Sequence, residues 1–178
     1  KIPFCEYFII PYVLWYLYIA VATFYTLAKS KKDFIHLSSM VYLGMFGSMI
    51  ICTVYPSWHL LRPDIATMND NIFTKLVLYL WEIDNPAVIF PSMHVLVAVN
   101  ITVALIMADC MRGKTWWKVA AVIYTVLVSA STVLIKQHSI LDVFLALVFV
   151  LPYSLLTYLV IYPKKRWSKQ GKGVLSEN

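Results

Sequence analysis

Hydrophobic residues lie in five long stretches along the chain, and charged residues or proline bound each stretch. A helix needs roughly 20 apolar residues to cross a hydrocarbon core about 30 Å thick. Each stretch has a length suited to crossing this core, and none carries a charged residue at its centre. The pattern therefore predicts five transmembrane helices, over residues 7–28, 34–55, 92–111, 119–135 and 139–162.

One connection, residues 56–91, is much longer than the others, and such loops are usually functional or disordered. Within it, segment 72–83 has the apolar spacing of an amphipathic helix, with Asp70 or Asn71 as a suitable N-cap. We expect this helix to lie on the membrane surface and to cover the ends of the spans. Its apolar positions are Ile72, Phe73, Leu76, Val77, Leu80 and Ile83.

The composition agrees with this pattern, because 61% of the 178 residues are hydrophobic and 13% are charged. Soluble domains have about 25% charged residues. The net charge of +6 does not indicate a nucleic-acid partner, because no soluble segment offers a basic face. Cys5, Cys52 and Cys110 lack the spacing of a zinc ribbon or a disulfide framework. We predict an all-α fold, a polytopic transmembrane helix bundle.

The basic residues are distributed unevenly between the two ends of the predicted bundle. One side of the predicted bundle holds 11 of the 15 Lys and Arg residues, in segments 29–32, 112–118 and 164–172. Basic loops mark the cytoplasmic side of membrane proteins. We therefore expect a multi-pass protein of the cell membrane, with a transmembrane domain (residues 1–163), a basic cytoplasmic tail (residues 164–178) and the long loop outside.

Three polar clusters, far apart in the sequence, are expected at the outer ends of the spans. All three clusters are expected at the same depth in the membrane. Because polar groups are scarce elsewhere in the spans, this shared depth indicates that the clusters form one site. The clusters are Arg62-Pro63-Asp64, Pro91-Ser92-Met93-His94, and the segment that runs from Ser131 through His138 to Asp142.

His138 and Asp142 are four residues apart, and this spacing places them on one face of a helix. A carboxylate there can accept one imidazole N–H, fix the tautomer and raise the basicity of the other nitrogen. Ser139 and Asp142 also match a capping box, with Asp in the usual place of Glu. The two roles are compatible, but a cap by itself does not explain the histidine.

Ser92 and Ser139 each open a predicted span, and the free N–H groups and dipole of a helix N-terminus favour anions. Arg62 carries a planar, permanently charged guanidinium that suits phosphate. Taken singly, Ser92 is explained as an N-cap and Arg62 as an interfacial anchor. Together with His94 and His138, they describe phosphoryl transfer without a metal.

This combination resembles the type-2 phosphatidic acid phosphatase superfamily of membrane lipid phosphatases and haloperoxidase-related enzymes. The family pattern has three parts: Lys, six residues and Arg-Pro; then Pro-Ser-Gly-His; then Ser-Arg, five residues, His, three residues and Asp. The corresponding residues here are Arg62-Pro63, the segment 91–94, and Ser131-Thr132 followed by His138 and Asp142.

The resemblance implies a catalytic role for the transmembrane domain. His138 is the implied nucleophile that forms a phosphohistidine, Asp142 orients it, and His94 protonates the leaving alkoxide. No metal or other cofactor is implied, and the substrate is a lipid phosphate of the bilayer. Family members usually have six spans, which implies a further span ahead of Lys1. The residues implied to hold the phosphate are Arg62, Ser92, Met93 and Ser131.

The chain departs from the family pattern at three positions. Tyr55 stands where the first motif has Lys, Thr132 where the third has Arg, and Met93 where the second has Gly. Lys136 is a poor substitute unless the helix unwinds there, because in a continued helix two residues turn by ~200° and direct it away from His138. Fewer cations suit a phosphodiester, as in the related sphingomyelin and inositol phosphoceramide synthases.

Four functions stay open at this point. The first is a metal-independent lipid phosphatase that hydrolyses a phosphomonoester of a phospholipid or polyprenyl phosphate at the outer face. The second is a phosphotransferase that moves a phosphodiester head group between lipids. The third is a non-catalytic lipid-binding relative. The fourth is a zinc hydrolase that uses the two histidines and the aspartate as ligands.

Overall fold

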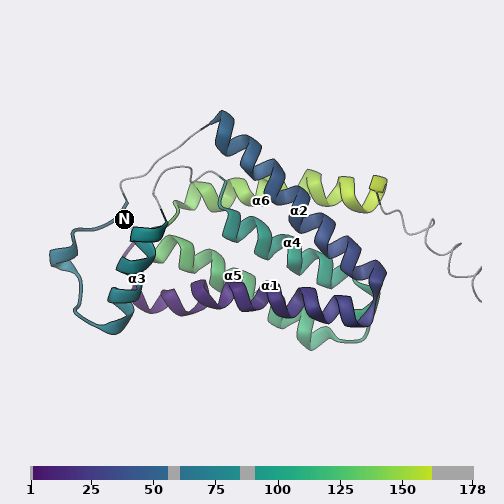
Figure 1. Ribbon diagram of the computed structural model, residues 1–178, viewed down its shortest axis with the longest axis horizontal. Coiled ribbons are helices and arrows are strands. Elements are labelled where there is room, and N and C mark those ends of the chain that lie inside the picture. The colour runs from purple at the N-terminus through teal and green to yellow at the C-terminus, as the bar shows by residue number, and fades with distance from the viewer. Residues whose placement is uncertain (1, 56–60, 85–90, 162–178) are drawn as a thin grey trace, which may run out of the picture.

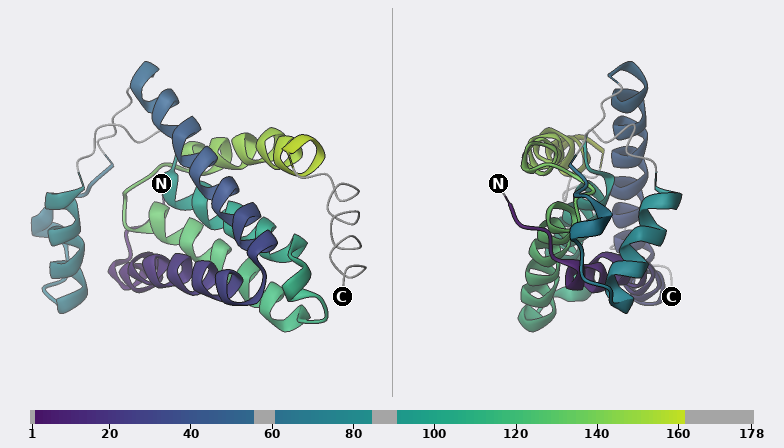
Figure 2. Two further views of the ribbon diagram at one scale, coloured as in Figure 1. Left: turned by 45° about the vertical axis from the view of Figure 1, so that its right-hand side comes forward. Right: turned by 90° about the vertical axis from the view of Figure 1, so that its left-hand side faces the viewer.

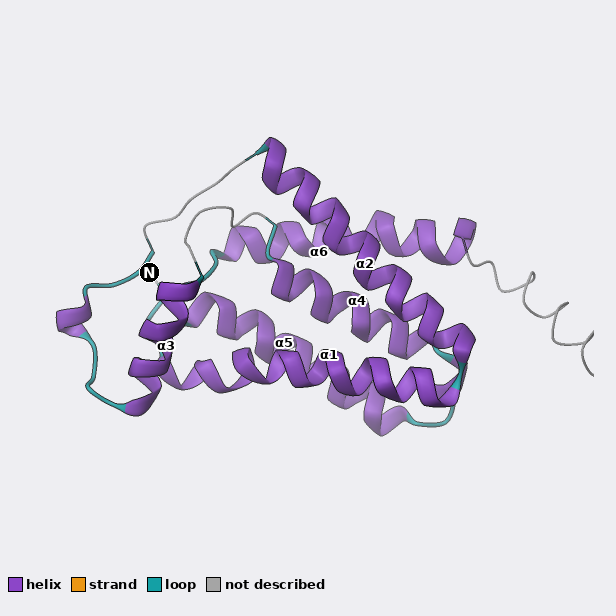
Figure 3. Ribbon diagram, viewed as in Figure 1, coloured by secondary structure: helices purple, strands orange, loops and turns teal. Residues whose placement is uncertain are grey.

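The computed structural model describes residues 2–55, 61–84 and 91–161, and within these ranges it contains six α-helices and no strand (Figure 3). The all-α fold predicted from the apolar pattern is confirmed. The helices are α1 (Ile9–Lys29), α2 (Lys31–Val54), α3 (Ile72–Ile83), α4 (Met93–Met107), α5 (Thr115–Leu134) and α6 (Ile140–Leu155). Short 3-10 turns occur at Glu6–Phe8, Ile65–Thr67 and Asp109–Met111, and α6 continues into a π-helical segment, Leu156–Ile161.

Four helical segments of the described chain are long and apolar enough to cross a membrane, and these are features of a membrane protein. They are Glu6–Lys29, Lys31–Val54, Thr115–Leu134 and Ile140–Tyr158. The remaining predicted span corresponds to α4, which is apolar but has only 15 residues. At 1.5 Å per residue, α4 is about 22 Å long, which is shorter than the hydrocarbon core.

Helix α4 occupies the centre of the bundle, which explains its short length. It packs against α1, α2, α5 and α6, so other helices and not lipid surround most of its surface. Figure 2 shows α2 running obliquely across the bundle, so that it crosses α4 rather than following it. The buried residues of α4 form the main core and include Val95, Leu96, Val97, Ala98, Ile101, Ala104 and Leu105.

The crossing of α2 over α4 depends on a small residue. A Cβ atom added at Gly44 would lie 2.5 Å from Nδ2 of Asn100 and 2.7 Å from Cδ2 of Leu96. Nδ2 of Asn100 is held in place because it donates a hydrogen bond of 3.1 Å to the carbonyl of Met40. Small residues with a polar partner are a common way for membrane helices to pack closely.

The two ends of the bundle differ in character. Segments 29–32 and 112–118, predicted to share one side, both lie at the end away from α3 (Figure 1). An ion pair at this end joins Nζ of Lys32 to Oδ2 of Asp109 at 2.8 Å. The predicted basic tail, residues 164–178, and its boundary lie outside the described residues.

Helix α3 lies across the opposite end of the bundle (Figures 1 and 2). Its bounds agree with the amphipathic segment predicted from the sequence, and the N-cap is Asn71, whose side-chain oxygen accepts the N–H of Thr74 at 2.9 Å. One face of α3 packs on the start of α1 and on the α5–α6 connection through Val77 and Trp81. The exposed apolar residues of α3 are Ile72, Leu76, Tyr79 and Ile83.

Candidate active site

The second and third polar clusters predicted from the sequence meet at the end of the bundle that α3 covers, and Arg62 of the first cluster reaches it, whereas Asp64 is exposed and caps the Ile65–Thr67 turn. The second cluster opens α4, the third spans the α5–α6 connection, and the first precedes α3 (Figure 1). The imidazole rings of His94 and His138 lie close together, with their centroids 6.2 Å apart and their planes inclined at 56°. Arg62 reaches the same region and contacts Gln137, the neighbour of His138.

A tight turn places His138 at the start of α6. Helix α5 ends at Leu134, and Lys136 takes a left-handed conformation with φ of 60°. The backbone N–H groups of Gln137 and His138 then both donate to the carbonyl of Thr132 at 3.0 Å. The chain therefore reverses within a few residues, and the imidazole reaches the buried end of the bundle.

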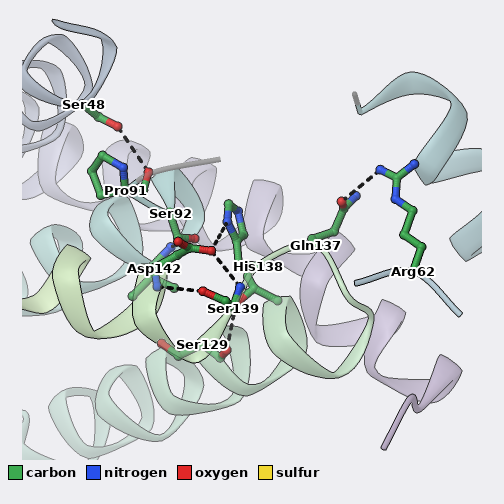
Figure 4. A network of polar contacts seen from close by, with 11 residues as sticks. Ser48, Arg62, Pro91, Ser92, Ser129, Gln137, His138, Ser139 and Asp142 are labelled. Carbon is green, nitrogen blue, oxygen red and sulfur yellow. Dashed lines mark hydrogen bonds and ion pairs between the residues drawn. The ribbon is translucent and has the colours of Figure 1, made fainter. Parts of the chain in front are cut away.

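Asp142 contacts both the turn and the imidazole (Figure 4). Its Oδ2 lies 3.8 Å from Nδ1 of His138, and the same oxygen accepts the N–H of Ser139 at 2.7 Å. The N–H of Asp142 donates to Oγ of Ser139 at 3.2 Å, so the predicted capping box is present. The carboxylate is 2% exposed, and it therefore combines the helix cap with a close approach to the histidine.

His94 lies between two aromatic side chains of α1. The ring centroids of Tyr12 and Trp15 are 4.5 Å and 4.4 Å from that of His94. Sequence reasoning missed both residues, because within an apolar stretch an aromatic near a catalytic group looks the same as one facing lipid. Their spacing of three residues, which puts them on one face of α1, was the available signal.

Several buried polar atoms in this region lack a hydrogen-bond partner among the described residues. They include Nδ1 of His94, Nδ1 of His138, Nε1 of Trp15 and Nε of Arg62. Buried polar groups are nearly always hydrogen-bonded in native proteins, so an unpartnered group calls for an explanation. Nδ1 of His138 has Oδ2 of Asp142 at 3.8 Å, just beyond hydrogen-bond distance, so Nδ1 of His94 and Nε1 of Trp15 are the ring atoms here with no polar partner among the described residues.

The N-terminus of α4 adds backbone donors to this region. Ser92 is the N-cap, is fully buried, and accepts the N–H of Val95 on its Oγ at 3.5 Å. Met93 is the first helical residue and is 39% exposed. The first N–H groups of a helix have no partner inside it and carry the positive end of the dipole. The opening of α4 therefore favours an anion.

Ser131 and Thr132 are both fully buried in the last turn of α5. The hydroxyl of Ser131 donates to the carbonyl of Val128 at 2.7 Å, and that of Thr132 donates to the carbonyl of Ser129 at 2.8 Å. Both hydroxyl protons are thus engaged inside the helix. Ser131 is buried at the end of α5, just before the turn that carries His138, but its hydroxyl is directed at the backbone of its own helix.

Arg62 binds the C-terminal end of α3. Its Nη1 donates to the carbonyl of Trp81 at 2.9 Å, and its Nη2 donates to the carbonyl of Asp84 at 2.7 Å. Nη2 also lies 3.5 Å from Oε1 of Gln137, as Figure 4 shows. Burial lowers the pKa of Arg62, and the negative charge of Asp84 opposes that shift. A cation at this position complements the negative end of the helix dipole.

The other cations near this end are also directed elsewhere. Because α5 ends at Leu134, the argument from a continued helix does not apply to Lys136, but its Nζ still turns away and donates to the carbonyl of Ile2 at 2.6 Å. Lys75 pairs with Asp70 at 3.0 Å. Within residues 61–84 and 91–161, none of the hydrogen bonds or ion pairs joins a Lys or Arg side chain to His94 or His138.

The described side chains include no group of three His, Cys, Asp or Glu close enough to hold a metal ion. The zinc hydrolase considered from the sequence therefore has no ligand set in this part of the chain.

Comparison with known proteins gives one match. A family model of the PAP2 superfamily matches residues 38–166, which is most of the chain and includes Arg62, His94 and His138. No curated protein and no solved structure matches the chain. The resemblance found on the three motifs is thus supported by a match over the whole region that contains them. The chain belongs to the PAP2 superfamily, whose members in general have phosphatase or lipid phosphotransferase activity.

Proposed function

We propose that this protein is a membrane lipid phosphatase that hydrolyses a phosphomonoester of a phospholipid or polyprenyl phosphate without a metal. The observation that carries the proposal is the pair of neighbouring imidazoles, His94 and His138, whose centroids are 6.2 Å apart, with the buried carboxylate of Asp142 beside His138. The reaction takes place at the α3 end of the bundle, which the distribution of basic residues assigns to the extracytoplasmic face.

In the first step, Nε2 of His138 attacks the phosphorus atom, and the bond between phosphorus and the lipid oxygen breaks. The imidazole gains positive charge as it forms the phosphohistidine, and Asp142 next to Nδ1 stabilises that charge. His94 donates a proton to the departing alkoxide, so the lipid leaves as an alcohol.

In the second step, His94 takes a proton from a water molecule, and the resulting hydroxide attacks the phosphorus atom. The phosphorus–nitrogen bond breaks, His138 is restored, and inorganic phosphate leaves. The backbone N–H groups that open α4 stabilise the phosphate oxygens in both steps, together with Ser92 and Met93. Arg62 and Ser131 join them only after exchanging the partners they have in the structure.

A second function is favoured by one observation: the basic side chains near the site already have other hydrogen-bond partners. Arg62 is bound to α3, and Lys136 is bound to the carbonyl of Ile2. A monoester carries up to two negative charges and a diester carries one, so a site with few available cations suits a diester better. In the corresponding reaction His138 attacks the phosphorus of a phosphodiester lipid, whose diacylglycerol-type alcohol leaves with a proton from His94. The hydroxyl of a second lipid then gives its proton to His94 and attacks the phosphorus, the phosphorus–nitrogen bond breaks, and a new phosphodiester forms.

The experiment is a panel of lipid phosphates and phospholipids given to the purified protein, scored for free phosphate and for new diester in the same samples. Phosphate release from monoesters supports the phosphatase, and a new diester with an acceptor lipid supports the transferase. His138→Ala and His94→Ala should each lower the observed activity by about 10³-fold or more.

The matched control is His36→Ala, because His36 is a buried histidine of α2 at the opposite end of the bundle. It should keep full activity. If the unchanged protein and His138→Ala are equally inert on every lipid, both enzymatic proposals are wrong and the non-catalytic lipid-binding reading is favoured.

A further inference from the structure

Asp84 joins helix α3 to the rest of the site. It is the C-cap of α3, and its Oδ2 accepts two hydrogen bonds from elements far away in the sequence. The hydroxyl of Tyr12 on α1 donates to this oxygen at 3.3 Å, and Nε2 of Gln137 in the α5–α6 turn donates to it at 3.3 Å. One carboxylate oxygen thus connects three separate parts of the chain.

Each of these two partners is in direct contact with a candidate catalytic histidine. The ring of Tyr12 lies 4.5 Å from the ring of His94, centroid to centroid. Gln137 precedes His138, and the N–H groups of both residues share the carbonyl of Thr132 as acceptor. Tyr12 is 1% exposed and Gln137 is 6% exposed, so neither side chain can turn to solvent without disturbing its neighbours.

Asp84 is also held through its own backbone carbonyl, which accepts a hydrogen bond from the side chain of Arg62. Nη2 of Arg62 donates to the carbonyl of Asp84 at 2.7 Å, and Nη1 donates to the carbonyl of Trp81 at 2.9 Å. Nε1 of Trp81 in turn donates to the carbonyl of Ile135 at 3.1 Å, in the turn that carries His138. The C-terminal end of α3 is therefore tied to the bundle at several points, and the carboxylate has little freedom to move.

We propose that Asp84 is a positioning residue that fixes both imidazoles relative to each other, His94 through Tyr12 and His138 through Gln137. Its carboxylate touches neither histidine, so it acts through the orientation of the two side chains it binds. Helix α3 is then part of the site and not merely a cover over it. The role in catalysis rests on the proposed function, whereas the coupling of Asp84 to the two histidines does not.

Removing the carboxylate should loosen both histidines. In Asp84→Ala the hydroxyl of Tyr12 and the amide of Gln137 become buried donors without an acceptor, and they must shift to find one. Asp84→Asn keeps an oxygen at the same position and should restore most of the contact, because the amide oxygen accepts the same two bonds. Glu82→Ala is the matched control, since Glu82 is an exposed acid two residues earlier on α3.

The first readout is the NMR spectrum of the protein with labelled histidines, in detergent micelles. Asp84→Ala should move or broaden the imidazole signals of His94 and His138 and leave His36, at the other end of the bundle, unchanged. Asp84→Asn and Glu82→Ala should give spectra close to the unchanged protein. If Asp84→Ala leaves the signals of His94 and His138 in place, or moves His36 equally, the proposal is overturned, whether or not the protein is an enzyme.

The second readout is kinetic and uses the lipid that the panel identifies. Asp84→Ala should lower kcat by about tenfold or more with KM changed by less than about twofold, and Asp84→Asn should recover most of the loss. A rise in KM with kcat unchanged assigns Asp84 to substrate binding and overturns the positioning role. If the unchanged protein acts on no lipid, the proposed function has failed, and the NMR result decides the coupling alone.

Discussion

The double role of Asp142 can be separated by comparing Asp142→Asn with Ser139→Ala. The carboxylate both caps α6 and lies 3.8 Å from Nδ1 of His138. Asparagine keeps an oxygen that accepts the N–H of Ser139, so the cap survives while the negative charge is lost. Ser139→Ala removes the Oγ that accepts the N–H of Asp142, but leaves the charge beside the histidine.

The expected sizes of the two effects follow from these distances. Two unit charges 3.8 Å apart interact by about 4 kcal/mol at an effective dielectric constant of about 20. In the proposed reaction the imidazole of His138 becomes positive only as it bonds to phosphorus, so this energy would lower the barrier and corresponds to about 10³-fold in rate. Loss of an N-cap hydroxyl costs about 1 kcal/mol of stability and does not act on the barrier.

The assay combines single-turnover phosphate release with thermal unfolding, both in the same detergent. Asp142→Asn should lower the rate by about 10²- to 10³-fold and unfold within a few degrees of the unchanged protein. Ser139→Ala should lower the unfolding temperature and keep the rate within about threefold.

Two outcomes would refute this reasoning. If Asp142→Asn keeps the rate within about threefold, the carboxylate is a helix cap and nothing more. If Ser139→Ala loses as much activity as Asp142→Asn, the cap and the orientation of His138 are inseparable, and the charge of Asp142 has no separate effect on the reaction.

Three further predictions concern packing, α3 and metals. Gly44→Ala should destabilise the protein by about 1–3 kcal/mol in thermal unfolding, because its Cβ would lie 2.5 Å from a hydrogen-bonded amide, whereas Gly47→Ala has open space and should not destabilise it. Arg62→Ala should raise the hydrogen-exchange rates of α3 amides by tenfold or more, about what the loss of two charge-assisted hydrogen bonds allows. Lys75→Ala, which removes an exposed cation of α3, should leave these rates unchanged. Exchange rates in Arg62→Ala equal to those of the unchanged protein would contradict the role of Arg62 at α3. Treatment with a chelator should leave phosphate release unchanged, and a loss restored by zinc would favour the metal hydrolase.

Much of the helix architecture was predictable because it depends on local sequence. The spacing of apolar residues over 72–83 predicted α3 with its observed bounds, since a helical face is set by the period of 3.6 residues alone. The capping box of Ser139 and Asp142 was predictable for the same reason, because both partners lie within one turn.

The length of α4 was not predictable in this way. The predicted span runs to Met111 with Asp109 as its one acid, but the helix ends at Met107 and a 3-10 turn follows. A helix that lipid surrounds must cross the whole hydrocarbon core, whereas one surrounded by other helices need not. Only the packing of the bundle shows which of the two conditions applies.

The class of fold and the residue types of the candidate site follow from the sequence, because hydrophobic period, helix caps and motif spacing act over a few residues. Which side chains meet depends on the tertiary structure. It placed Tyr12 and Trp15 against His94, and it directed Arg62 to the end of α3. These partners lie tens of residues apart, and no local pattern distinguishes a side chain that will contact the site from one that will face lipid or a neighbouring helix.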